Sequence, residues 1–144
     1  MKRRHSGFTL VEILIVVIIL GILAAIVIPQ FTNASNDARN NSIASTLQTV
    51  RSQIELFKIQ HSDTPPAGLW SVMLAKSTTT EVGPTAGSGT NFGPYLQQAP
   101  NNPANGLTVV GAAASTTVGW TYVVSGSAYT ISAVNTTGNA LLTY

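Results

Sequence analysis

The stretch Gly7–Phe31, GFTLVEILIVVIILGILAAIVIPQF, is a long apolar run with one carboxylate, Glu12, and one proline, Pro29. From Ile13 to Ile28 it contains no polar side chain. A helix needs about 20 mainly apolar residues to cross a bilayer, so the stretch predicts a membrane-spanning helix.

A basic segment, Lys2-Arg3-Arg4-His5, directly precedes the apolar run. Positive charges hold their side of a membrane helix in the cytoplasm, so the residues after the run are expected on the opposite side. A secretory signal peptide is one alternative, but its apolar core has about 7–15 residues and ends at a small-residue cleavage site. Here the apolar run is longer, and Pro29-Gln30-Phe31 follows it directly.

Glu12 is not explained by a plain membrane anchor and indicates that this segment has a further role. A charged side chain at mid-membrane costs up to about 3 kcal/mol on insertion scales, and less near the interface. A charge in this position normally has a partner, which a simple anchor does not supply. We therefore interpret the apolar run as a membrane-spanning segment that also takes part in assembly.

The helical pattern continues beyond Pro29. Proline lacks the amide hydrogen and its ring clashes with the carbonyl of Ala25, so a kink is expected, and Gly21 weakens the helix further. An amphipathic stripe follows at Ile43, Leu47, Val50, Ile54 and Phe57. Residues at these spacings share one face of a helix. The sequence therefore predicts a helix from Phe8 to about Gln60 whose second part faces a core.

The remaining chain predicts a small head. Thr64-Pro65-Pro66 ends the long helix, because a residue before proline avoids the helical region. The apolar cluster Leu69–Leu74 predicts a short helix, and residues 76–91, rich in Thr, Gly and Ser, predict a loop.

The end of the chain predicts strands, because it contains β-branched and aromatic runs. These runs are Leu107–Val110, Trp120–Val124, Tyr129–Ala133 and a short edge strand at Leu141–Tyr144. Ser125-Gly126-Ser127 is expected to join two of them as a hairpin. The expected fold class is α+β, with a long N-terminal helix packed on a small antiparallel sheet.

Charge is scarce and unevenly distributed. Charged residues make up 8% of the chain, against about a quarter in typical soluble domains, and none follows Glu81. Three of the seven basic residues precede Gly7, so the net charge of +2 does not indicate a nucleic-acid-binding surface. The absence of cysteine excludes disulfides, thiol nucleophiles and thiolate metal sites.

No arrangement of residues predicts catalysis, so the protein is not expected to be an enzyme. The serines lack a Gly-x-Ser-x-Gly elbow, the acidic residues are scattered, and the glycine-rich segment has no phosphate-binding lysine. His61 is expected to be solvated at the end of the long helix, where the helix dipole favours it. Trp70 and Trp120 are expected in the core.

The motif Gly7-Phe8-Thr9-Leu10-Val11-Glu12, followed by the apolar run and Pro29, resembles the type IV pilin superfamily. The resemblance implies that a prepilin peptidase cuts after Gly7 and methylates the new N-terminal amine of Phe8. It implies that Glu12 pairs with the Phe8 amine of a neighbouring subunit, and that the helix bends or melts at Gly21 and Pro29 during assembly. Opposite charges in a low-dielectric interior attract strongly only at short range, which suits a role in setting subunit register.

The rest of the chain resembles the major pseudopilins of type II secretion systems. The resemblance rests on the long helix, Gly93-Pro94-Tyr95-Leu96, the pair Pro100 and Pro103, and the hairpin that contains Trp120. It implies a helical homopolymer, the pseudopilus, that serves protein secretion across the outer membrane. Its implied partners are the prepilin peptidase, the inner-membrane secretion platform and minor pseudopilins. The implied location is the inner membrane, crossed once, with the N-terminus cytoplasmic and the head periplasmic.

These expectations divide the chain into a leader at 1–7, a transmembrane and assembly helix at 8–31, an amphipathic helix at 32–61 and a head at 62–144. Major pseudopilins commonly bind calcium through acidic residues in their C-terminal loops. Because no Asp or Glu follows Glu81, and calcium sites normally depend on carboxylates, no calcium or other cofactor is expected.

Two alternatives stay open. A type IV pilus or competence pilin shares the N-terminal features, although such pilins often carry a C-terminal disulfide loop that this chain cannot form. A membrane-anchored binding domain that uses the loop at 76–91 would need neither processing at Gly7 nor Glu12.

Overall fold

The computed structural model describes residues 7–77 and 92–141. Their elements, in chain order, are α1 (Leu10–Gln60), α2 (Leu69–Met73), β1 (Val110–Gly111), β2 (Trp120–Ser125), β3 (Ala128–Val134) and β4 (Ala140–Leu141). The chain divides into two compact units, residues 1–38 and 39–144, with the boundary inside α1. The loop expected at 76–91 lies outside the described residues except for its first two.

The first unit contains the apolar part of α1, which runs through Pro29 as continuous helix. The large apolar side chains from Phe8 to Phe31 are all exposed. The hydroxyl of Thr32 donates to the carbonyl of Ile28 at 3.1 Å, next to the proline. The predicted helix is confirmed from Leu10 to Gln60, and the kink at Pro29 stays a prediction.

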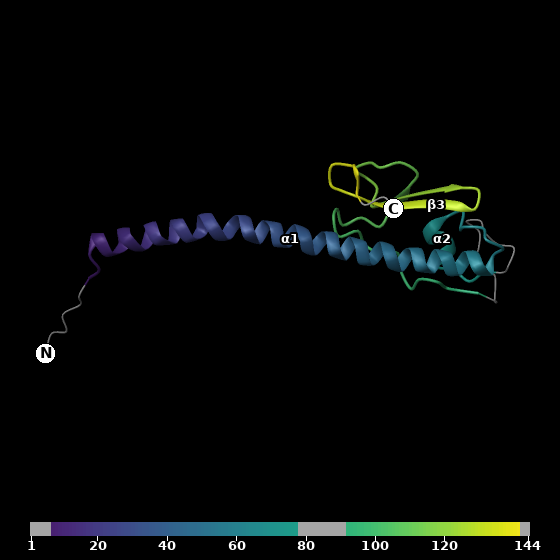
Figure 1. Ribbon diagram of the computed structural model, residues 1–144, viewed down its shortest axis with the longest axis horizontal. Helices are drawn as coiled ribbons and strands as arrows, with labels where there is room; N and C mark the ends of the chain where they lie inside the picture. The colour runs from purple at the N-terminus through teal and green to yellow at the C-terminus, as the bar shows by residue number, and fades with distance from the viewer. Residues whose placement is uncertain (1–6, 78–91, 142–144) are drawn as a thin grey trace. The chain divides into compact units, whose positions relative to one another are not determined.

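The second unit is an α+β head in which the later part of α1 packs against a sheet (Figure 1). The predicted stripe is confirmed, because its five members are the buried residues of α1: Ile43, Leu47, Val50, Ile54 and Phe57. Trp120 and Ile131 of the sheet and Met73 of α2 join them in one core. Trp120 is fully buried, as predicted, whereas Trp70 is half-buried and donates its indole N–H to the carbonyl of Thr108 at 2.6 Å.

The sheet has the strand order β1-β2-β3-β4. β2 and β3 form the predicted antiparallel hairpin, with Trp120 opposite Ala133 and Gly126 at a positive φ of 63° in the turn. β4 pairs with β3 antiparallel. β1 pairs with β2 in parallel, so the sheet is mixed and not wholly antiparallel as expected. The α+β fold class itself is confirmed.

Two glycines allow backbone segments of the head to approach closely. Gly93 has φ = 80°, and a Cβ there would lie 2.7 Å from the carbonyl oxygen of Ala75. A Cβ on Gly119 would overlap the carbonyl oxygen of Leu107. Both contacts are shorter than real Cβ contacts, so these positions need a residue without a side chain.

His61 is buried, and the expectation that it would be solvated is wrong. Its ring is 1% exposed and stacks on Phe57, with ring centroids 3.8 Å apart. Nδ1 lies 2.8 Å from the carbonyl oxygen of Phe57, and Nε2 lies 2.9 Å from the Oγ of Ser77. The helix dipole acts on His61, but packing of Phe92 and Tyr95 against its ring excludes water.

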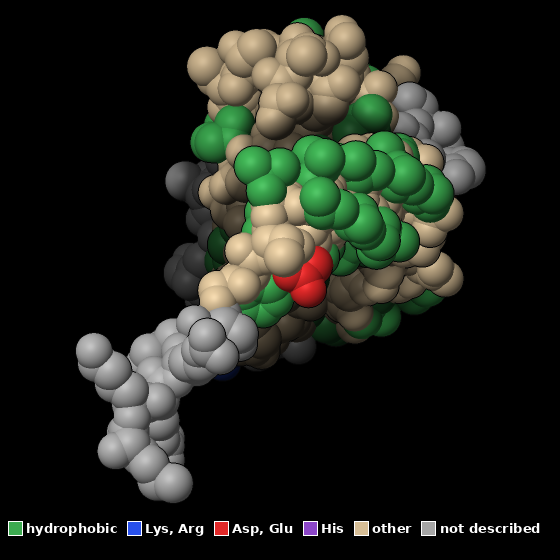
Figure 2. Space-filling view, turned by 90° about the vertical axis from the view of Figure 1, so that its left-hand side faces the viewer, with side chains coloured by type: hydrophobic (Ala, Val, Ile, Leu, Met, Phe, Trp, Pro, Cys, Tyr) green, Lys and Arg blue, Asp and Glu red, His purple; other side chains and the backbone are tan. Residues whose placement is uncertain are grey.

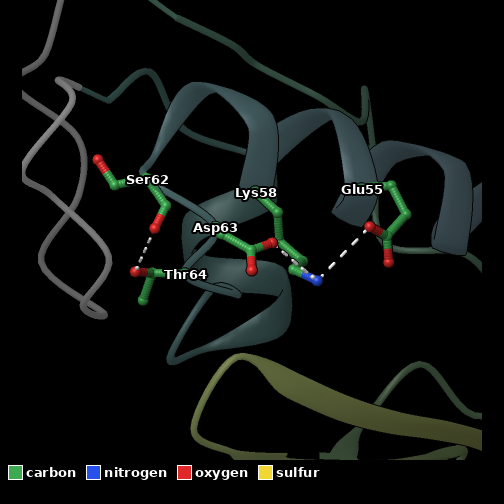
Figure 3. A network of polar contacts seen from close by, with 5 residues as sticks. All are labelled: Glu55, Lys58, Ser62, Asp63 and Thr64. Carbon is green, nitrogen blue, oxygen red and sulfur yellow. Dashed lines mark hydrogen bonds and ion pairs between the residues drawn. The ribbon is translucent and has the colours of Figure 1, made fainter.

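Directly after α1 the chain turns through two residues with positive φ, Ser62 at 55° and Asp63 at 60°. The N–H of Asp63 donates to the carbonyl of Lys58 at 2.8 Å, which closes the helix end. Lys58 lies between the carboxylates of Asp63, at 3.2 Å, and Glu55, at 3.6 Å (Figure 3). The hydrogen bond with Asp63 raises the pKa of Lys58.

Candidate processing and assembly site

α1 begins with a reciprocal arrangement of Thr9 and Glu12. The backbone N–H and the hydroxyl of Thr9 both donate to Oε2 of Glu12 at 2.8 Å. In return, the backbone N–H of Glu12 donates to Oγ1 of Thr9 at 3.2 Å. This is a capping box, which satisfies two of the backbone donors that a helix start leaves without partners. The carboxylate also lies where the helix dipole favours negative charge.

Thr9 is a member of this site that reasoning from the sequence missed. The signal was present, because a threonine three residues before a glutamate at the start of an apolar run is typical of a capping box. Thr9 therefore holds the carboxylate of Glu12 against the first turn of α1.

Gly7 and Phe8 lie directly before the helix, and both are exposed. The side chain of Phe8 is 82% exposed. Apart from its chain neighbours, no atom of the described residues lies within 4 Å of the position that a Cβ on Gly7 would take. The peptide bond between them therefore lies in non-helical, open backbone, the form in which a protease can approach it.

Gly7, Phe8, Thr9 and Glu12 line one open hollow of about 300 Å³. The structure thus brings together three residues that the sequence singled out for cleavage, methylation and assembly: Gly7, Phe8 and Glu12. Gly21 and Pro29 lie further along α1 and do not take part in this hollow.

An apolar surface begins beside the hollow. A groove lined by Phe8, Thr9, Leu10, Ile13, Leu14 and Val17 follows along α1. Figure 2 shows hydrophobic side chains gathered into a broad patch at this end of the molecule, with acidic atoms beside it. By length and composition, α1 contains a segment able to cross a membrane. Gly21 lies on this segment, and within the described residues a Cβ there would meet no atom within 4 Å other than the neighbouring backbone of α1.

No metal-binding group is found in residues 7–77 and 92–141, where no three His, Asp or Glu side chains come together. The site at the start of α1 therefore offers hydrogen bonding, one negative charge and an apolar surface. These are properties of a binding surface for a cationic group and for a second apolar segment.

Comparison with known proteins gives a family match at this end of the chain. Residues 2–28 match the family model described as the prokaryotic N-terminal methylation motif. A longer match is to the type II secretion system core protein G of Pseudomonas aeruginosa, 31% identical over 102 residues, which cover 71% of this chain and 70% of that protein. The chain belongs to the family of the type II secretion system core protein G.

Other relatives match over shorter ranges. The core protein G of Dickeya chrysanthemi is 35% identical over 80 residues, which span 56% of this chain and about half, 52%, of that protein. The type IV narrow pilus major component PilA5 of Thermus thermophilus is 37% identical over 62 residues, 43% of this chain and 53% of that protein. No solved structure gives a significant match. Membership of the core protein G family agrees with the pilin-like α+β head and with a methylation motif that includes Gly7, Phe8 and Glu12.

Proposed function

We propose that the chain is a structural subunit of a type II secretion pseudopilus, a helical filament that serves protein secretion. The observation that carries the proposal is the similarity to core protein G, which extends over 71% of the chain and so includes more than the methylation motif. A structural role also suits a chain whose candidate site combines one carboxylate with a long apolar surface.

Processing would occur between Gly7 and Phe8. The open backbone at this bond makes it accessible, and cleavage would remove Lys2, Arg3 and Arg4 together with the rest of the segment before Phe8. The prepilin peptidase would then methylate the amine of Phe8. The mature subunit would begin at Phe8, so Thr9 of the capping box would be the residue next to the new terminus.

Glu12 would receive the Phe8 amine of a neighbouring subunit. In the described part of the chain, the hydrogen bonds to this carboxylate all end on Oε2. A carboxylate can accept about four hydrogen bonds, so Oε1 stays open to a further donor. The capping box would thus orient the acceptor before a partner arrives. A charged pair in a low-dielectric interior is strong only when its geometry is good, so it would fix subunit register.

The apolar part of α1 would have two successive environments. In the inner membrane it would span the bilayer, with the N-terminus cytoplasmic and the head periplasmic. After extraction by the secretion platform, the same side chains would pack against those of other subunits. Contacts of this kind join two different surfaces of identical subunits, and such head-to-tail interfaces build open-ended helical filaments.

The decisive experiment is the intact mass of the protein from a host with its own prepilin peptidase. We expect loss of Met1–Gly7 and gain of one methyl group on Phe8. A full-length mass, or cleavage after Ile28, would contradict the proposal and would favour a membrane-anchored binding domain or a secretory signal peptide.

A second experiment tests Glu12 itself. Glu12→Leu should leave membrane insertion intact, because it removes a charge from an apolar helix, but should abolish filament assembly. Glu12→Gln is the matched control, since it keeps a capping acceptor for Thr9 and removes only the charge. If Glu12→Gln assembles normally, the charge pair is not needed; if Glu12→Leu also assembles normally, Glu12 has no role in assembly.

A type IV pilus subunit is the second candidate, and the similarity to the narrow pilus component PilA5 favours it. Complementation experiments distinguish a pseudopilus subunit from a pilus subunit. Expression in a strain that lacks core protein G should restore secretion, and expression in a strain that lacks its major pilin should not restore pili. The opposite result would select the pilus function.

A further inference from the structure

The C-terminal loops of the head are held together by asparagine side chains. The amide of Asn102 is fully buried and donates to the carbonyl oxygens of Gly119, at 2.5 Å, and Val134, at 2.8 Å. These carbonyls lie just before β2 and at the end of β3. Its own Oδ1 accepts the N–H of Ala104 at 2.8 Å. One side chain therefore ties the loop that contains it to two neighbouring strands.

Asn105 repeats the arrangement one turn later. Its amide donates to the carbonyl of Val118 at 2.9 Å, and its Oδ1 accepts the N–H of Leu107 at 3.0 Å. Two asparagines of the same loop thus bind the carbonyls of two consecutive residues, Val118 and Gly119.

The loop after β3 is folded around Asn135. Its Oδ1 accepts the N–H of Thr137 at 3.0 Å, the hydroxyl of Thr137 at 2.7 Å and the N–H of Asn139 at 2.8 Å. In the neighbouring loop, the hydroxyls of Ser115 and Thr117 bond to each other at 3.0 Å. Oδ1 of Asn135 and the hydroxyls of Ser115 and Thr117 therefore already take part in internal hydrogen bonds.

A calcium ion, which the resemblance to major pseudopilins suggests for these loops, does not fit this donor set. Calcium sites use six to eight oxygens and normally include carboxylates. The sequence has no Asp or Glu after Glu81. The carbonyl of Gly119 accepts both the amide of Asn102 and the N–H of Val134, at 3.0 Å, so its two lone pairs are used.

We infer that the head of this chain folds without a bound cation, because the amide of Asn102 takes the place between the carbonyls of Gly119 and Val134 that a cation would otherwise fill. An amide N–H₂ carries two donors and no formal charge, so it can join two carbonyl oxygens without any carboxylate to balance a metal ion. The inference does not depend on the proposed function, because it concerns the stability of the head alone.

The first test is thermal unfolding of the full chain in detergent micelles, followed by the near-ultraviolet circular dichroism of its tryptophans. The melting temperature should be the same in excess chelator and in about 5 mM calcium chloride, well above the weakest dissociation constants of about 1 mM for extracellular sites. A ligand that binds only the folded state raises the melting temperature, so a rise with calcium would overturn the inference.

The second test changes Asn102 itself. Asn102→Ala removes the side-chain donor from the buried carbonyl of Val134 and one of the two donors from the buried carbonyl of Gly119, so it should lower the melting temperature by about 10 °C or more. Asn101→Ala, at the exposed neighbouring position, is the matched control and should shift it by less than about 3 °C. If Asn102→Ala melts like the unmodified chain, the inference is wrong. If it fails to fold while Asn101→Ala folds, the anchoring role of Asn102 is supported.

Asn102→Asp provides a third, opposite test. A carboxylate placed against two carbonyl oxygens is repelled by them, so this variant should be less stable than the unmodified chain in chelator. Calcium should restore part of the loss, because the substitution supplies the missing carboxylate. If calcium stabilises the unmodified chain as much as this variant, the amide does not replace a cation.

Discussion

The ring of His61 lies between two partners of different chemistry. The carbonyl oxygen of Phe57 can only accept a hydrogen bond, whereas the hydroxyl of Ser77 can donate or accept. Nδ1 must therefore carry a hydrogen, and in the neutral ring Nε2 accepts from Ser77. His61 thus continues the buried face of α1 one turn past Phe57.

We predict that neutral His61 is the Nδ1–H tautomer. Ring nitrogen chemical shifts of the full chain, labelled at histidine, report this directly. Ser77→Ala should leave the tautomer unchanged, because the carbonyl of Phe57 remains in place. Observation of the Nε2–H tautomer would show that the bond to Phe57 is not formed.

The error about His61 shows what sequence patterns leave out. Its spacing of four residues from Phe57 extends the apolar stripe, and that signal favoured burial. Histidine at a helix end is equally well placed for solvent, and the choice depends on Ser77 and Phe92, which come later in the chain. Glu12 could be singled out from the sequence because a charge in an apolar run is a local feature.

At the scale of the element, the end of α1 carries a conformation that suits glycine. Ser62 has φ = 55°, in the left-handed region that costs residues with a Cβ about 1–2 kcal/mol. Its side chain makes no core contact, since Ser62 is exposed. The turn is thus held in place by its neighbours, including the bond from Asp63 to Lys58.

We predict that Ser62→Gly stabilises the head by about 0.5–1 kcal/mol, the gain in the turn less the greater freedom of glycine in the unfolded chain. Ser52→Gly is the matched control, because Ser52 is exposed within α1, and it should destabilise by about 0.5 kcal/mol. Chemical denaturation in micelles measures both. Equal signs for the two variants would contradict the assignment of a left-handed turn.

The strands β2 and β3 lie where they were predicted, whereas β1 and β4 each overlap their predicted runs by one residue, Val110 and Leu141. Residues 142–144 of the predicted edge strand lie outside the described residues. The pairing of the strands could not be predicted. β-branched and aromatic residues indicated the β2–β3 hairpin, whose turn contains Gly126. β1 has only two residues, and it pairs in parallel with β2 through Val110 and Trp120. A strand that short has no alternation of polar and apolar residues from which a direction could be inferred.

At the scale of the whole molecule, tyrosines in the head make its stability depend on alkaline pH. Burial, and then the neighbouring Glu55, raises the pKa of Tyr129 to about 12. Burial also raises the pKa of Tyr122, whose hydroxyl donates to the carbonyl of Pro66 at 2.9 Å. Folding thus favours the neutral phenols over the ionised ones.

The sign of the effect follows from the raised values. The unfolded chain ionises near the usual pKa of 10.0, so the stability contributed by neutral Tyr129 is complete below that pH and is lost as the pH rises toward 12. Lys58 has a raised pKa and contributes in the same direction.

We predict that the tyrosinate absorbance of the full chain rises at a pH above the usual tyrosine pKa of 10.0. The rise should coincide with loss of the near-ultraviolet circular dichroism of the head. Tyr129→Phe should reduce the loss of stability between about pH 10 and pH 12, because it removes one of the ionising groups. Ionisation of all tyrosines near pH 10 with the head still folded would contradict the prediction.

The isolated β-bridge between Ser77 and Phe92 suggests a place to insert a tag for imaging. The N–H of Ser77 donates to the carbonyl of Phe92 at 2.9 Å, and the N–H of Phe92 donates to the carbonyl of Ser77 at 3.1 Å, so these two residues are held next to each other. Lengthening a segment whose ends are already joined costs little, about 0.6 kcal/mol for each doubling. A fluorophore-binding tag inserted between residues 78 and 91 should therefore leave the fold intact, and it would allow filament growth to be followed in living cells.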